Sequence, residues 1–237
     1  LALGTGFLGI SYEILGIRVL SQVTENTVHT LAATLAVFLL GTSLGAGIQR
    51  GLARRGWVSF WVPVGGGSGP GARGTGRPEV SPTGSGLLLL GLVVLAQAWV
   101  FARGSALAGW MGAWAPGWAA ELLLAGAVFL VPTMLMGAVF GQLAQAGAGL
   151  RIGVGGVVAW NAVGGALAGP GMMGVLLPWL GVSGALLALG AGYLLLPARF
   201  STVRGVGLGL GLLLALAMPR GLRMVEVPPG AEVTWFR

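Results

Sequence analysis

The feature that most constrains this chain is a series of seven long apolar stretches with very few charged residues. They cover approximately residues 1–22, 28–49, 85–102, 117–146, 152–178, 182–198 and 203–219. A helix that crosses a bilayer needs about 20 apolar residues, and most of the stretches have this length. They are too long for core helices and lack the alternation of barrel strands. The sequence therefore predicts an all-α membrane protein, a polytopic bundle of about seven transmembrane helices.

The composition also favours lipid as the surrounding solvent. Charged residues make up 8% of the chain, hydrophobic residues 55%, and the mean hydropathy is +0.89. A soluble domain carries about 25% charged residues, and so little polar surface cannot cover a water-soluble fold. The net charge of +7 comes from arginine alone, which in a membrane protein is typical of loops rather than of nucleic-acid binding. We expect the lipid bilayer, and not nucleic acid, as a partner.

Missing residue types exclude several classes of function. The sequence has no lysine, so it can form no retinal or pyridoxal-phosphate Schiff base and no Walker-type phosphate loop. Without cysteine, disulfides, thiolate metal sites and thiol catalysis are excluded. One histidine and no aspartate leave too few ligands for a haem pair or a carboxylate metal cage. We therefore predict no catalytic residue, metal site or cofactor within these residues.

The arginines predict the orientation in the membrane. With seven spans, residues 50–85, 151 and 199–204 share one side and carry eight arginines, whereas the loop after the third stretch carries only Arg103. Because cytoplasmic loops are enriched in arginine, we expect that side to face the cytoplasm of a multi-pass protein in the inner membrane. The N-terminus would be inside and the C-terminus outside, although two further arginines after the last stretch do not favour this.

The stretches are interrupted at a few recognisable places. The Gly/Pro/Ser-rich tract at about residues 62–85 is typical of a flexible loop. We expect residues 1–219 to form the transmembrane domain and residues 220–237 to be a linker toward a separate soluble domain. Pro132 should bend the fourth stretch, and Gly169-Pro170-Gly171 should break or kink the fifth.

Small residues four apart predict glycine-mediated packing of the helices. The pattern occurs three times, at Gly41 and Gly45, Gly137 and Gly141, and Gly165 and Gly169. Such ridges let helix backbones approach closely in lipid, where apolar burial does not drive association.

Tryptophans predict where the bundle meets the headgroups. Trp110, Trp114 and Trp118 recur every four residues and would form one aromatic face on a short helix. A second interfacial anchor is predicted at Trp57, Phe60 and Trp61. A lipid-interface belt explains both groups better than a ligand cage does.

Polar residues in or beside the apolar stretches are the candidates for a ligand site. They are Glu13, Arg18, Glu25, His29 and Asn161. A charge buried in lipid costs at least about 2.5–3.5 kcal/mol, so Glu13 should be protonated, paired or facing a polar cavity. A spacing of five residues turns Glu13 and Arg18 about 140° apart, so each should find its partner on another helix. A structural interhelix ion pair and a site for a cationic substrate or proton both remain open, with the ion pair slightly favoured.

The other candidates have structural as well as functional interpretations. Glu25 and His29 are four apart and could titrate as a pair, but a capping region at the membrane surface is the favoured interpretation. Asn161 should bond across to another helix. Glu121 is predicted in the first turn of the fourth helix, where the helix dipole favours an anion.

Five short segments of the sequence, taken together and in order, resemble a known membrane domain. They are residues 6–20 (GFLGISYEILGIRVL), 26–27 (NT), 38–45 (FLLGTSLG), 132–138 (PTMLMGA) and 159–169 (AWNAVGGALAG). They resemble the membrane domain of bacterial multi-pass spermidine synthase-like proteins, in which a helical membrane domain precedes an aminopropyltransferase domain.

The resemblance implies that the chain anchors an aminopropyltransferase domain and binds or passes polyamines. Glu13 would be the first acidic group to contact a polyamine, and Glu25 the second. The Gly-rich cofactor motif and the catalytic aspartate of that enzyme are absent from these residues. The alternative is a structural scaffold subunit that associates with its own copies or with partner membrane subunits. A secondary transporter is the third possibility.

Overall fold

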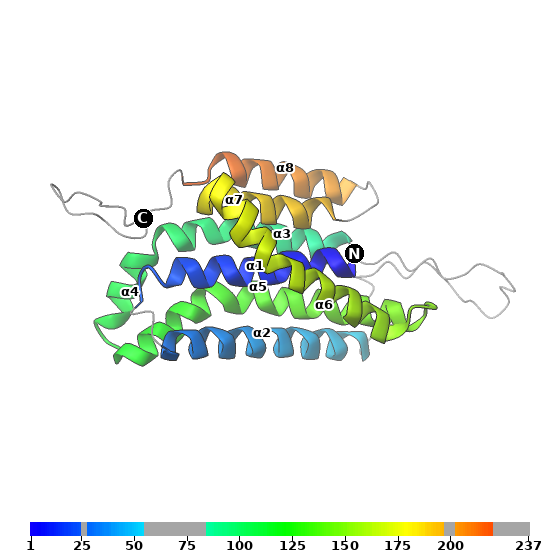
Figure 1. The fold of residues 1–237 in the computed structure, drawn as a ribbon, viewed down its shortest axis with the longest axis horizontal. Helices are drawn as coiled ribbons and strands as arrows, with labels where there is room; N and C mark the ends of the chain where they lie inside the picture. The colour runs from blue at the N-terminus through cyan, green and yellow to red at the C-terminus, as the bar shows by residue number, and fades with distance from the viewer. Residues whose placement is uncertain (25–27, 55–83, 197–201, 220–237) are drawn as a thin grey trace, which may run out of the picture.

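The described part of the chain is helical and contains no strand, which confirms the all-α prediction for these residues (Figure 1). The computed structural model describes residues 1–24, 28–54, 84–196 and 202–219. The helices are α1 (Ala2–Leu20), α2 (Val28–Arg54), α3 (Gly84–Ala102), α4 (Gly104–Gly112), α5 (Gly117–Ala148), α6 (Gly153–Gly171), the π-helical segment η2 (Met172–Leu176), α7 (Leu177–Leu195) and α8 (Thr202–Leu216).

Five helical stretches are long and apolar enough to cross a membrane, rather than the seven predicted. They are Ala2–Leu20, Val28–Leu52, Ser85–Ala102, Gly117–Ala148 and Gly153–Leu195. The difference arises partly because two predicted spans form one helical run of 43 residues, and partly because the apolar part of α8, Gly205–Leu216, is short.

The predicted boundary between the fifth and sixth stretches, at residues 179–181, does contain a turn, whereas the predicted break or kink at Gly169-Pro170-Gly171 is not a break. The α-helix continues through these residues, and η2 follows them directly. The non-helical residue is Gly181, with φ +65° and ψ −176°, where the chain turns back so that α7 runs beside α3 (Figure 1). A positive φ strains residues that carry a Cβ, so glycine is the residue that permits this turn.

The parallel pair α2 and α5 forms one side of the bundle (Figure 1). Gly41 faces the Thr133 side chain, and Gly45 faces the backbone of Met134, so a Cβ at either glycine would overlap its neighbour. Gly137 of α5 in turn faces the backbone of Thr42. These approaches are closer than any residue with a side chain permits.

The same close approach recurs elsewhere but not at every predicted glycine. Gly6 of α1 and Gly164 of α6 face the backbone of the opposite helix, at Asn161 and Leu3 respectively. By contrast, a Cβ at Gly169 would meet no atom within 4 Å.

Polar pairs join α2 to α5 near both ends of their contact. At one end the Thr30 hydroxyl donates to the Glu121 carboxylate over 3.0 Å. At the other end the amides of Gln49 and Gln145 bond reciprocally, over 3.4 and 3.0 Å. The prediction that Glu121 lies in the first helical turn is wrong, because α5 already begins at Gly117.

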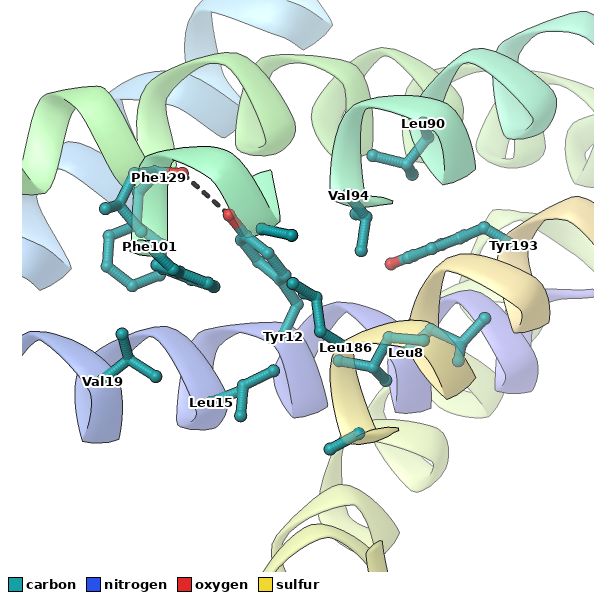
Figure 2. Packing of buried hydrophobic residues seen from close by; sticks show 14 of the residues in the cluster. Leu8, Tyr12, Leu15, Val19, Leu90, Val94, Phe101, Phe129, Leu186 and Tyr193 are labelled. Carbon is teal, nitrogen blue, oxygen red and sulfur yellow. Dashed lines mark hydrogen bonds between the residues drawn. The ribbon is translucent and has the colours of Figure 1, made fainter. Parts of the chain in front are cut away.

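A tyrosine of α1 donates a hydrogen bond to a carbonyl of α5 that lacks its helical donor because of a proline. Pro132 has no backbone N–H, so the Val128 carbonyl lacks its usual donor four residues along the helix. The Tyr12 hydroxyl donates to this carbonyl over 2.8 Å (Figure 2). Its ring also meets Phe129 edge-on, with ring centroids 5.9 Å apart. Both aromatic side chains are fully buried in the core.

The tryptophan group does not lie on a single short helix as predicted. Trp110 belongs to α4, Trp114 to the turn after it, and Trp118 to α5, because a new helix begins after Pro116. All three are at least 59% exposed, and the rings of Trp110 and Trp114 stand edge to face. The predicted anchor at Trp57, Phe60 and Trp61, most of the 62–85 tract and the linker at residues 220–237 lie outside the described residues.

Candidate functional site

A cavity among the described residues lies between α1 and α2, against α5. Its volume is about 330 Å³, and α3, α6 and α7 each contribute one residue to its lining. Gly6 and Gly9 of α1 are two of the lining residues. Gly9 has free space beside it, since an added Cβ there would meet only two atoms within 4 Å, at 3.6 and 3.7 Å.

Two polar side chains meet at the α1–α6 side of this cavity. The Thr5 hydroxyl lies 3.4 Å from Oδ1 of Asn161 and 3.0 Å from the carbonyl oxygen of Ala2. The amide nitrogen of Asn161 donates to none of the residues in the described ranges. Asn161 therefore accepts a hydrogen bond from another helix through Oδ1, and its amide nitrogen is left as a donor without an acceptor among the described residues.

A third polar group comes from α7. Tyr193 is fully buried, and its hydroxyl has no hydrogen-bond partner among the described residues. Its ring reaches from α7 into the interior, on the side of Leu90 and Val94 (Figure 2). Buried polar groups nearly always have a partner, so this hydroxyl is an exception that requires an explanation.

The rest of the lining is uncharged and largely apolar. Phe38, Met136 and Phe140 supply much of the wall. The hydroxyls of Thr42 and Ser43 also line the cavity, but both donate to carbonyls of their own helix. Ser43 is exposed on the outer face of α2, so the cavity reaches the surface of the bundle there.

Two further cavities are smaller. One of about 120 Å³ lies between α2 and α5 and is lined by Gln142, whose Oε1 has no partner in the described part of the chain. Another of about 200 Å³ lies between α1 and α2, near Ser21 and Thr30. No charged residue lines any of these three cavities within the described ranges.

The structure does not bring the predicted site residues together. Asn161 lines the large cavity. Glu13 lies one helical turn from Gly9 and Ile10 and is half-buried, but it does not line the cavity. Arg18 and His29 are exposed, and Glu25 lies outside the described residues. Neither Glu13 nor Arg18 forms an ion pair within the described ranges. That each pairs with a group on another helix stays a prediction.

Sequence reasoning missed Tyr193 and Thr5. The chain contains only two tyrosines, Tyr12 and Tyr193, and both lie within apolar stretches. A buried tyrosine usually needs a partner for its hydroxyl, so these two residues could have been selected from the sequence.

The described residues contain no group of three or more His, Asp or Glu side chains that could hold a metal ion. Comparison with protein families, curated proteins and solved structures finds no match to this chain. The function must therefore be argued from its own residues.

Proposed function

We propose that this chain is a multi-pass integral-membrane domain of the inner membrane. The observation that carries the proposal is the outer surface of the long apolar helices. Leu35, Leu39 and Leu44 of α2 are 44–55% exposed, and Trp179 of α7 is 83% exposed. Large apolar side chains in such numbers are unfavourable in water, and lipid is the solvent that accommodates them.

We extend the proposal to seven crossings. A straight helix of 43 residues would measure about 65 Å, roughly twice the thickness of the hydrocarbon core. The run from Gly153 to Leu195 therefore crosses twice, and Gly181 is the turning point. With α8 this gives seven crossings, and the tight glycine contacts supply the van der Waals packing that holds helices together in lipid.

We further propose that the domain anchors an aminopropyltransferase domain, as in spermidine synthase-like proteins. The resemblance of residues 6–20 and 159–169 supports this role. No carboxylate lines the three cavities within the described residues, which favours anchoring over polyamine carriage, because a buried cation without a negative partner is costly. The full reading frame of the gene tests the proposal. A Gly-rich strand–loop–helix followed by acidic residues after Arg237 is expected, whereas stoichiometric partner subunits and no such domain would favour a scaffold subunit.

The orientation can be tested with single cysteines, because the native sequence has none. Ser105 in α4 and Leu150 in the α5–α6 connection are exposed at opposite ends of the bundle (Figure 1). We expect a membrane-impermeant maleimide to label Ser105→Cys in spheroplasts and Leu150→Cys only after lysis, because Leu150 adjoins the arginine-rich side. The cysteine-free parent is the control. Equal labelling of both sites in sealed spheroplasts would contradict the membrane-spanning arrangement.

Polyamine binding at Glu13 is tested separately. If Glu13 contacts the cation, spermidine should raise the melting temperature of the wild-type protein, and Glu13→Gln should abolish that shift. Glu121→Gln is the matched control, because the Glu121 carboxylate is already bonded to Thr30 and should not contribute. A shift of the same size in wild type and Glu13→Gln, or none in either, would remove Glu13 as a polyamine ligand.

A further inference from the structure

The two tyrosines of the chain use their hydroxyls differently. Tyr12 donates to the Val128 carbonyl, whereas Tyr193 has no partner among the described residues. Both are fully buried, so the Tyr193 hydroxyl has been removed from solvent without compensation within the described chain. It lines the cavity of about 330 Å³, a size within the range of small-molecule sites.

The polar groups of the cavity specify the hydrogen bonding of an occupant. Tyr193 offers an O–H donor, and Asn161 offers amide N–H donors. Thr42 and Ser43 donate to their own helix, so their hydrogens are not available. The complementary group on an occupant is a hydrogen-bond acceptor such as a carbonyl oxygen.

The lining also specifies charge and polarity. The described lining residues include no charged side chain, and burying an unpaired ion there would be costly. Phe38, Phe140 and Met136 surround the remaining space with apolar and aromatic surface. The opening at Ser43 lies on the face of α2 that we assign to lipid. An occupant can therefore enter from the bilayer if it is neutral and lipid-soluble.

We propose that this cavity binds a neutral, lipid-soluble carbonyl compound, held by hydrogen bonds from Tyr193 and Asn161. The proposal goes beyond the anchoring role and rests only on the membrane setting. The carbonyl could belong to a glycerolipid ester or to a small cyclic molecule such as a quinone. The chemistry at the site is the same for both sources.

The purified full chain in detergent provides the test, with a decyl-substituted benzoquinone and dioctanoylglycerol as separate probes. One of them should raise the melting temperature saturably and remain bound in native mass spectrometry. The probe that does so identifies the source of the carbonyl. If neither produces a saturable shift, the proposal is overturned, and water alone satisfies the hydroxyl.

Tyr193→Phe separates ligand binding from a structural role. The variant keeps the ring and removes a hydroxyl that has no partner in the described part of the chain, so the melting temperature without ligand should be unchanged or slightly higher. The dissociation constant for the active probe should rise about three- to tenfold, as expected for one lost hydrogen bond. A lower melting temperature without ligand, together with unchanged probe affinity, would show a structural role and overturn the proposal.

Gly9→Ala narrows the cavity beside the Tyr193 hydroxyl without disturbing its walls. The added Cβ would lie 3.6 Å from the Tyr193 hydroxyl oxygen and 3.7 Å from the Met136 sulfur, both ordinary contacts. We expect the variant to fold and to bind the active probe at least tenfold more weakly. Gly126→Ala in α5 is the matched control, because its Cβ would meet nothing within 4 Å, and its affinity should equal that of wild type.

Spermidine distinguishes this proposal from the polyamine hypothesis. A spermidine shift that Gly9→Ala abolishes would place a cation in the cavity and overturn the assignment of a neutral ligand. A spermidine-induced rise in melting temperature that Glu13→Gln abolishes and Gly9→Ala does not would place the cation outside the cavity. The two hypotheses can therefore fail independently.

Discussion

Gly45→Ala is expected to lower the free energy of unfolding by about 1–3 kcal/mol, the usual cost of overpacking. The added Cβ would overlap the backbone of Met134, which cannot move aside as a flexible side chain can. Helices α2 and α5 must therefore separate. The separation lengthens both polar contacts between them, Thr30 with Glu121 and Gln49 with Gln145. Thermal melting and resistance to SDS in detergent measure the loss.

Gly47→Ala is the matched control for this experiment. Gly47 lies two residues further along the same helix, and a Cβ there would meet nothing within 4 Å. Because alanine loses less backbone entropy than glycine, this variant should gain roughly 0.5–1 kcal/mol. Equal effects of the two substitutions would mean that helix propensity, and not the α2–α5 contact, determines stability.

The apolar stretches predicted most of the helices, because length and composition alone decide what can be helical in lipid. Helices α1, α2, α3 and α5 begin or end within a few residues of the predicted limits. The turn at Gly181 lies in the predicted gap between the fifth and sixth stretches, at residues 179–181, although the sequence does not show which glycine there adopts a positive φ. A break or kink was predicted at Pro170, but the α-helix continues past this residue, and only the following turn widens to a π-helix.

The candidate site was predicted only in part, for a related reason. Asn161 was selected because an amide within an apolar stretch is conspicuous, and it does line the cavity. Glu13 is equally conspicuous but does not line it. Which face of a helix meets which neighbour depends on tertiary packing when nearly every face is apolar. Tyr193 could have been selected as one of two tyrosines within apolar stretches, but only the folded protein shows that its hydroxyl, unlike that of Tyr12, has no partner among the described residues.

The bond between Tyr12 and Val128 gives the second large prediction. Tyr12→Phe removes the donor that the described residues supply to the Val128 carbonyl, which has no helical partner because of Pro132, while the buried ring and its contact with Phe129 remain. A buried carbonyl without a partner costs about 1–3 kcal/mol. We expect a loss of that size in the free energy of unfolding, measured by thermal melting.

Pro132→Ala provides the compensating change, because alanine restores the backbone N–H that can bond the Val128 carbonyl. Tyr12→Phe should therefore be much less destabilising in a Pro132→Ala background than in the wild type. The coupling free energy from this double-mutant cycle measures how strongly the two positions interact through the Val128 carbonyl, since both substitutions act on that acceptor. If Tyr12→Phe costs the same in both backgrounds, the hydroxyl stabilises the fold through some other contact, and the proline does not explain why a tyrosine occupies this position in α1.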